Sequence, residues 1–160
     1  MTDKHRYRLR FFKRDRLRFI SHHDLMQTFE RALRRAGFRV AHSQGFNPRP
    51  KLTFALALPL GVESWDEVVD IELEESPPPG VLLERLKTQL PEGLEPAACV
   101  LVDVRDKARV SFCRFETDVP PGDVALAVNA IERFSQPGAI PVVRESREKR
   151  RETDLKACVQ

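Results

Sequence analysis

The segment from residue 43 to residue 51, which we call the 43–51 loop, carries the side chains of this sequence best suited to binding. It combines two amides, two cations and one aromatic ring, which belong to Gln44, Asn47, Arg49, Lys51 and Phe46. Groups of these kinds recognise the unpaired bases and the phosphates of nucleic acids. The alternative is a turn rich in glycine and proline, with the Phe46 ring tucked into the core.

Arginines alternate with apolar residues between residues 6 and 12, and again between residues 16 and 20. Alternation with a period of two puts one set of side chains on each face of a strand, so we expect a hairpin or one bulged strand here. Like charges that lie close together repel, so such a row favours a polyanionic partner over a role in stability. The arginines of this row are Arg6, Arg8, Arg10, Arg16 and Arg18.

The net charge of +3 is unevenly distributed along the chain. Residues 1–51 contain 14 Lys or Arg against 4 Asp or Glu, whereas residues 52–160 contain 13 against 20. Such asymmetry between segments indicates a polyanionic partner for the basic part. The alternative is that arginine is simply a common solvated residue in this composition. In the acidic part, Asp70, Glu72 and Glu74 share one strand face and are expected to be solvated, or to contact a basic partner.

A helix is expected to start at Ser21, because Asp24 follows three residues later as in a variant of the capping box. An apolar stripe runs along this helix, and Gly37 is well placed to end it. Three further arginines lie off the stripe and would extend the basic surface; they are Arg31, Arg34 and Arg35. His22 is expected to contact a phosphate. His22 and His23 are adjacent, and no third His or Cys stands at a spacing that suits a shared metal ion, so no metal site is predicted.

The sequence contains no recognisable catalytic set and no glycine-rich phosphate loop, so we predict no catalytic residue and no cofactor. The three cysteines are far apart and form no disulfide framework, which fits a reducing cytoplasm. Neither a secretory signal nor an apolar run long enough to span a bilayer is present. These features predict a cytoplasmic protein with no membrane partner.

The order of the expected elements predicts an α+β fold. Residues 1–105 are predicted to form a basic unit of the ferredoxin-like split β-α-β kind, with further strands at 52–58, 68–74 and 97–104 and a helix at 81–90. Residues 106–160 are predicted to form a second α+β unit, with strands at 110–117 and 140–143 and a helix at 124–134. Because residues 154–160 resemble the start of another element, this unit is expected to be incomplete. The alternative is that both units pack as one domain.

Four stretches of the sequence, at residues 16–26, 29–37, 43–50 and 57–64, resemble the radical-SAM-linked protein family. The string Ser-Gln-Gly-Phe-Asn-Pro-Arg-Pro at residues 43–50 is the most specific of them, whereas His23 stands where an apolar residue is expected. That family is a bacterial domain of unknown function, found alone or fused behind a cobalamin-binding radical SAM enzyme. Its genes often lie beside one for an RNase E/G-type ribonuclease. The resemblance implies a role near RNA processing or modification and carries over no catalytic residue.

Together these observations predict an accessory RNA-binding module, with tRNA or rRNA as its ligand. A cobalamin-binding radical SAM protein or an RNase E/G-type ribonuclease is its expected protein partner. Two alternatives remain open. One is a protein-interaction domain that docks on a radical SAM enzyme. The other is an RNA-modifying enzyme with its site around His22, Asp24 and the 43–51 loop.

Overall fold

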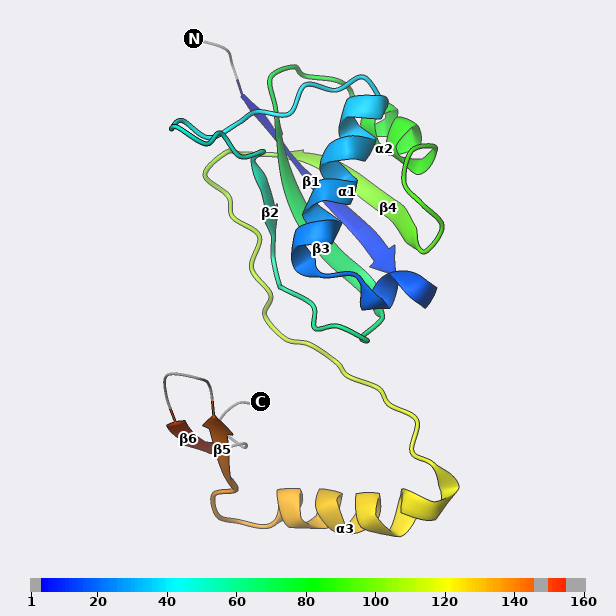
Figure 1. Ribbon diagram of the computed structural model, residues 1–160, viewed down its shortest axis with the longest axis vertical. Coiled ribbons are helices and arrows are strands. Elements are labelled where there is room, and N and C mark those ends of the chain that lie inside the picture. Colours follow the sequence, from blue (N-terminus) through cyan, green and yellow to red (C-terminus); the bar gives the residue numbers. More distant parts are fainter. Residues whose placement is uncertain (1–3, 146–149, 155–160) are drawn as a thin grey trace. The chain divides into compact units, whose positions relative to one another are not determined.

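The computed structural model describes residues 4–145 and 150–154, and the chain divides into two compact units, residues 1–110 and 111–160 (Figure 1). The first unit contains β1 (His5–Lys13), the 3-10 helix η1 (Asp15–Phe19), α1 (His22–Arg35), β2 (Leu52–Phe54), β3 (Ser64–Leu73), α2 (Pro79–Lys87) and β4 (Leu94–Val102). The second contains η2 (Pro121–Asp123), α3 (Val124–Ser135), β5 (Pro141–Glu145) and β6 (Arg150–Asp154). The predicted α+β class is confirmed.

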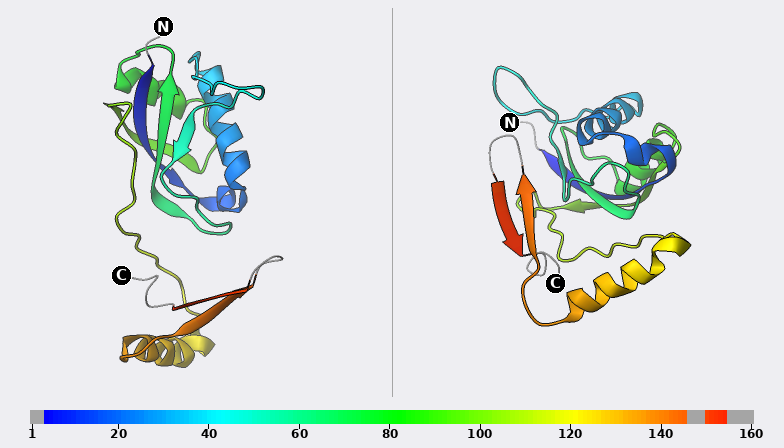
Figure 2. Two further views of the ribbon diagram at one scale, coloured as in Figure 1. Left: turned by 90° about the vertical axis from the view of Figure 1, so that its left-hand side faces the viewer. Right: turned by 60° about the horizontal axis from the view of Figure 1, so that its bottom comes forward.

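The first unit is built on a four-stranded antiparallel sheet with the strand order β2-β3-β1-β4. The arginine-rich strand β1 is therefore central and is paired on both sides. Its apolar residues Tyr7, Leu9 and Phe11 are buried with residues of α1 and α2 in one core. Both helices therefore cover the same face of the sheet, and Figure 2 shows α1 lying along one side of β2 and β3. We call the opposite face, which carries the arginines of β1, the open face.

Helix α1 begins and ends as predicted. The Ser21 hydroxyl oxygen accepts a hydrogen bond from the backbone N–H of Asp24 at 3.1 Å, which satisfies one of the free donors of the first turn. The helix ends at Arg35, and Gly37 follows with a φ of 83°, a conformation that favours glycine. Phe29 packs edge-on against Phe11 of β1, with ring centroids 4.8 Å apart. This contact fixes the helix on the sheet.

The prediction that residues 16–20 continue the strand pattern is wrong, because residues 15–19 form η1. Both edges of β1 are already occupied by β3 and β4, so no edge is free for a hairpin partner. The chain turns at Asp15, which has a φ of 55°, and the Arg14 N–H donates to the Gly93 carbonyl at 2.9 Å. Arg16 and Arg18 therefore leave the plane of the sheet instead of extending the row of β1.

The second unit consists of α3 and the antiparallel hairpin β5-β6. The strand predicted at residues 110–117 is not formed, and its side chains, including Phe112 and Phe115, are exposed. None of the residues of this unit whose burial the structure describes is buried. Residues 155–160, where the start of a further element was predicted, lie outside the described residues. Within the described part of the chain, no helix is both long and apolar enough to cross a membrane.

Candidate nucleic-acid interface

Arginines of β1 face carboxylates of β3 across the open face. The strand register places Arg6 opposite Glu72 and Arg8 opposite Asp70. Arg6 Nη2 donates a hydrogen bond to Glu72 Oε1 at 2.7 Å. Arg8 donates two hydrogen bonds to the Asp70 carboxylate, at 2.8 and 3.1 Å. Asp70 and Glu72 are only 3% and 6% exposed. The expectation that these acids are solvated is therefore wrong, because the pairing of β1 with β3 joins the acidic and the basic strand faces.

The segment that follows β4 covers this part of the open face. The backbone carbonyl of Asp106 accepts hydrogen bonds from Arg6 at 3.3 Å and from Arg8 at 3.0 Å. The N–H of Ala108 donates to Asp70 at 3.2 Å. Lys51 adds a further ion pair, because its Nζ lies 2.9 Å from Glu72 Oε2. Arg6, Arg8 and Lys51 are therefore committed to contacts within the protein.

The ion pairs of the open face shift the pKa values of their members. The hydrogen bond from Arg8 to Asp70 is the main reason why the pKa of Arg8 is raised above its ordinary value, against the opposing effect of burial. Burial by itself would raise the pKa of Glu72. The hydrogen bonds and charges of Arg6 and Lys51 together outweigh burial and hold that pKa below 4.5. The folded protein therefore favours the ionised form of Glu72.

We expect Glu72 to make the stability of the first unit sensitive to acid. Because its pKa is lower in the folded than in the unfolded state, its contribution is fully present above about pH 4.5. The contribution is lost as the pH falls through the folded-state pKa. Urea unfolding between about pH 6 and about pH 3 should show a steeper loss of stability for the natural protein than for Glu72→Gln. Glu84→Gln, at an exposed pair with Lys87, is the control that should keep the natural slope. Equal slopes for all three proteins would contradict this role of Glu72.

The other end of the open face is exposed and aromatic. Arg10 pairs with Asp66, but both side chains remain more than half exposed, at 57% and 53%. Beside them the Phe12 and Trp65 rings lie with centroids 6.1 Å apart, and the Arg14 guanidinium lies 4.8 Å from the centre of the Trp65 ring. Sequence reasoning missed this group. Its one signal was that Trp65 is the only tryptophan of the chain.

The remaining arginines of the predicted row lie around η1. Arg16 is exposed, whereas Arg18 pairs with Glu63 at 3.1 Å and stacks on Phe19 at 4.8 Å. Beneath them Lys13 is 1% exposed, and its Nζ lies 3.4 Å from the Arg18 carbonyl oxygen. Burial lowers the pKa of Lys13 below 10.5. Of these three cations, Arg16 alone has its charge available to a ligand.

Arginines of α1 form a second basic area on the outward side of the helix. Residues three and four apart share one side of a helix, so Arg31, Arg34 and Arg35 lie together opposite the core stripe. Among the described residues, no carboxylate lies within ion-pair distance of these three. Arg35 donates to the Gln89 carbonyl at 2.6 Å. Arg85 of α2 lies beside Gly37, just after the helix. We call Arg31, Arg34, Arg35 and Arg85 the helix patch.

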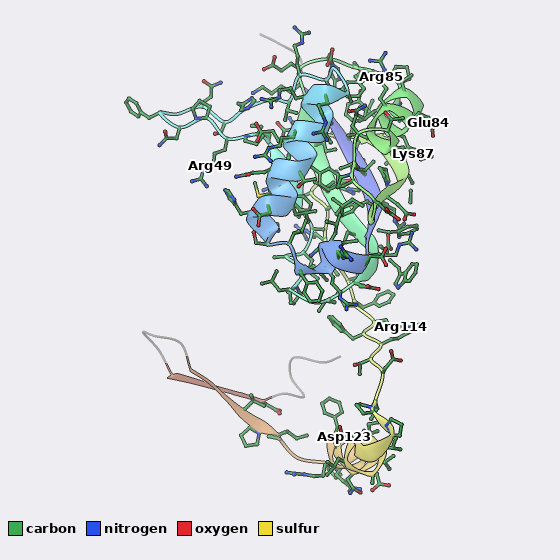
Figure 3. All side chains as sticks on the ribbon, turned by 45° about the vertical axis from the view of Figure 1, so that its right-hand side comes forward. Arg49, Glu84, Arg85, Lys87, Arg114 and Asp123 are labelled. Atoms are coloured by element: carbon green, nitrogen blue, oxygen red, sulfur yellow. The ribbon has the colours of Figure 1, made fainter. Side chains whose placement is uncertain are left out.

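The helix patch and the arginines of β1 do not form one continuous surface. The core residues of β1 face α1, so the alternating arginines of that strand lie on the far side of the sheet from the helix. Arg85 belongs to the last turn of α2, where Figure 3 labels it. The basic sequence of residues 1–51 is thus divided by the sheet into two areas, and those areas differ in how far carboxylates neutralise them.

His22 lies at the start of α1 with its ring edge-on to Phe54, at a centroid distance of 5.1 Å. The Asp24 carboxylate accepts a hydrogen bond from the Ser21 hydroxyl at 2.7 Å, so it belongs to the cap of the helix. His23 contacts Gln27 at 3.2 Å. In the part of the chain that the structure describes, no group of three or more His, Cys, Asp or Glu side chains could hold a metal ion. His22 remains exposed beside the aromatic core.

The 43–51 loop is closed at its base and exposed at its tip. The Ser43 N–H donates to the Arg49 carbonyl at 2.8 Å, and the Arg49 N–H donates to the Ser43 hydroxyl at 3.0 Å. Gln44, Phe46 and Asn47 are exposed, so the alternative that the Phe46 ring is tucked into the core is wrong. Figure 3 shows the Arg49 side chain projecting from the loop.

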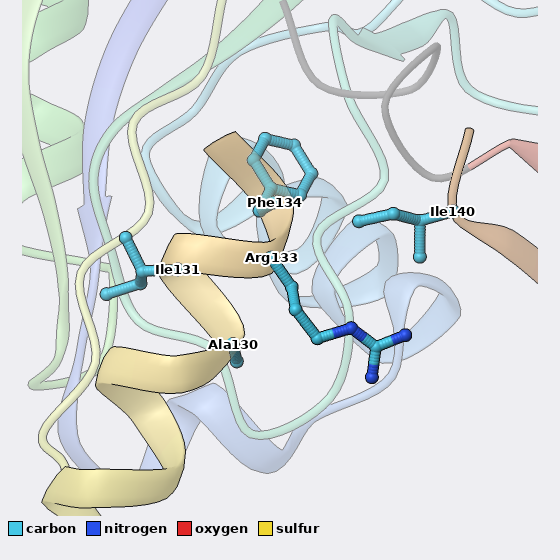
Figure 4. Close-up of a pocket in the computed structure, with 5 residues that line it drawn as sticks. All are labelled: Ala130, Ile131, Arg133, Phe134 and Ile140. Carbon is cyan, nitrogen blue, oxygen red and sulfur yellow. The ribbon is translucent and has the colours of Figure 1, made fainter. Parts of the chain in front are cut away.

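An open hollow of about 710 Å³ with both polar and apolar lining lies beside this loop. It is lined by Lys4, His42, Ser43, Gln44, Gly45, Pro48 and Glu74. The hollow of the second unit is also open, with a volume of about 440 Å³, but its lining is mainly apolar (Figure 4). Its lining comes from α3 and from the residue before β5, with Ala130, Ile131, Arg133, Phe134 and Ile140. Polar groups that could bind a nucleotide therefore gather at the 43–51 loop.

A family model described as an uncharacterized protein conserved in bacteria, DUF2344, matches residues 6–160. The chain belongs to this family. No curated protein and no solved structure matches it. This result agrees with the prediction that the chain is a bacterial domain of unknown function. The matched residues include parts of both units. The predicted link to radical SAM enzymes stays a prediction.

Proposed function

We propose that this DUF2344 member is an accessory module that binds RNA through the helix patch and the 43–51 loop. The helix patch carries the proposal, because its three arginines on α1 are exposed and have no carboxylate within ion-pair distance among the described residues. Clustered guanidinium groups that lack internal counter-charges are suited to contact phosphates. Arg16 and His22, which are exposed, and Arg10, whose pair is solvated, extend the possible contacts.

We also propose that the first unit has a ferredoxin-like fold. Two observations support this assignment. The elements follow one another as β-α-β-β-α-β when η1 is set aside, and β1 and β3 occupy the two central positions of an antiparallel sheet. In this fold one face of the sheet carries no helix; here the segment after β4 covers the part of that face around Arg6 and Arg8, and the end around Arg10 stays exposed.

The 43–51 loop favours RNA over duplex DNA as the ligand. Sequence-specific RNA recognition mostly targets unpaired bases, which stack on aromatic rings and form hydrogen bonds along their edges. Phe46 offers a fully exposed ring, while Gln44 and Asn47 offer amides on the same loop. The resemblance to the radical-SAM-linked family points to tRNA or rRNA. Cations whose charges are paired within the protein are expected to contribute less to RNA binding than the helix patch. They are Arg6, Arg8, Arg18 and Lys51.

The experiment that tests this function compares binding of the purified protein to total tRNA and to duplex DNA across a series of salt concentrations. Tighter binding to tRNA is expected. The logarithm of the association constant should fall linearly with the logarithm of the salt concentration, with a slope of roughly 0.7 to 0.9 for each phosphate contacted. Absence of tRNA binding at low salt would rule the function out.

A second candidate function is a protein-interaction domain that docks on a cobalamin-binding radical SAM enzyme or on an RNase E/G-type ribonuclease. Large exposed apolar side chains of the second unit favour it, since exposed apolar surface can mark a protein interface. They include Phe112 and Phe115, 79% and 72% exposed, and Leu126 and Ile131 of α3, 68% and 66% exposed. A stoichiometric complex with either enzyme in the absence of RNA distinguishes this function from the first. The two functions are compatible.

A further inference from the structure

The exposed end of the open face carries a group of side chains that the helix patch and the 43–51 loop do not include. We call Phe12, Arg14 and Trp65 the aromatic cluster. We propose that the aromatic cluster is a stacking platform for an unpaired base of single-stranded RNA. This inference rests on the proposed RNA-binding function and assigns to it a second contact site, on the other side of the sheet from the helix patch.

A β-bulge aims Trp65 at the open face. Phe11 pairs with Glu67 and Lys13 pairs with Ser64, so the single residue Phe12 of β1 opposes two residues of β3. With strict alternation, Trp65 would point to the same side as Glu67, which is buried on the core face. The extra residue in β3 turns the Trp65 side chain toward the open face and interrupts the regular pairing of the strands. Bulges of this kind are frequent beside functional sites.

The indole is held in place while most of its surface stays open to solvent. Trp65 is 63% exposed, although tryptophan is on average a highly buried residue. The Arg14 guanidinium lies 4.8 Å from the centre of the Trp65 ring and 5.5 Å from that of Phe12. Glu95 of β4 forms an ion pair with Arg14 and so fixes the guanidinium. A ring that is already oriented loses little conformational freedom when a base stacks on it.

The arginines around the cluster, Arg10 and Arg14, are each paired with a carboxylate, so stacking on the rings supplies most of the attraction for a nucleotide. The neighbouring pair of Arg10 and Asp66 is solvated, and exposed ion pairs of this kind contribute little to stability. Arg10 can therefore turn from Asp66 toward a phosphate on its solvent side at small cost. The rest of the row is closed, because the backbone carbonyl of Asp106 is bound to Arg6 and Arg8. The aromatic cluster is thus the accessible end of the open face.

The position of the cluster also matches a known way of binding RNA. Aromatic side chains on a four-stranded sheet stack two or three bases in one common class of RNA-binding domain. Phe12 and Trp65 come from β1 and β3, the two central strands of a four-stranded sheet. An unpaired base has an exposed face for stacking, whereas a base inside a duplex does not. The platform therefore predicts a preference for single strands.

The test uses Trp65 as its own reporter, because it is the only tryptophan of the chain. A short single-stranded oligoadenylate carrying a fluorescein label is titrated into the full-length protein. Tryptophan fluorescence and label anisotropy are followed together, and a duplex of the same length serves as the comparison. We expect saturable quenching of Trp65 at the same concentrations at which the anisotropy rises, with little quenching by the duplex.

Variants separate stacking from general binding. Trp65→Ala should weaken binding of the single strand by about 5- to 100-fold, the range found for loss of one stacked base. Trp65→Phe should retain most of the affinity, because it keeps an aromatic face. Phe115→Ala is the matched control, since Phe115 is an exposed aromatic residue of the other unit, and it should leave the affinity unchanged.

The outcomes distinguish this inference from the proposed function. If the oligoadenylate raises the anisotropy without quenching Trp65, and Trp65→Ala binds as well as the natural protein, the platform is wrong while RNA binding stands. If neither the oligoadenylate nor total tRNA binds, both are wrong, and the exposed indole becomes a candidate protein contact. The quenching measurement uses the natural protein, so it decides the question even if the Trp65 variants fail to fold.

Discussion

Replacement of Asp70 by Asn is expected to destabilise the first unit by about 3 kcal/mol, the order of magnitude for loss of one partner from a buried ion pair. Asp70 is 3% exposed and receives two hydrogen bonds from Arg8 and one from the Ala108 N–H. Without the carboxylate, the Arg8 charge, whose side chain is 22% exposed, loses its main partner in the centre of the sheet. The segment after β4 loses one of its anchors as well.

Urea unfolding followed by the fluorescence of Trp65 measures this effect in the first unit, where the only tryptophan lies. Asp66→Asn is the matched control. It removes the same charge from the same strand, but from a pair with Arg10 in which both side chains are more than half exposed. We expect the free energy of unfolding of the control to fall by less than about 1 kcal/mol. An equal loss of stability in both variants would show that the arginine row has no separate structural and available parts.

That distinction marks the limit of what the sequence of β1 could show. The alternation of arginine with apolar residues correctly predicted that Arg6, Arg8 and Arg10 share one face of a strand. The same pattern in residues 68–74 predicted a strand with an acidic face. Nothing local to either strand indicates that the two become neighbours, because pairing is decided by the whole fold. The guanidinium row was therefore interpreted as free, although Asp70 and Glu72 neutralise most of it.

Elements defined by local contacts were the most predictable. Helix α1 was foreseen because its cap, Ser21, and its end, Gly37, act within a few residues of the helix. Residues 16–20 have the same alternation as β1, but a strand needs a free edge, and β1 has none. The strand predicted at residues 110–117 fails in a similar way, because none of the described strands pairs with that segment.

The candidate site was partly predictable for the same reason. The 43–51 loop and the arginines of α1 were found because loop composition and helical spacing are local features. The aromatic cluster was missed because it depends on a bulge between β1 and β3, and a bulge leaves no readable trace in one sequence. Arg85 was missed because its place beside Gly37 results from the packing of α2 against the sheet.

Replacing all three arginines of α1 by glutamine should weaken tRNA binding on the order of 100-fold at low salt, since three phosphate contacts would be lost together. Glutamine is nearly as good a helix former as arginine, so α1 should persist. The salt dependence gives the more diagnostic result. Its logarithmic slope should fall by roughly 2 to 3, which corresponds to the loss of about three released counterions.

The matched control is a triple variant in which Arg105, Arg109 and Arg114 become glutamine. It removes the same net charge from exposed positions in the irregular segment between β4 and α3, one of which is labelled in Figure 3. We expect this variant to keep the natural salt slope and to lose only about three-fold in affinity through long-range attraction. Equal losses in both triple variants would reduce RNA binding to overall charge. An unchanged slope in the α1 variant would remove the helix patch from the interface.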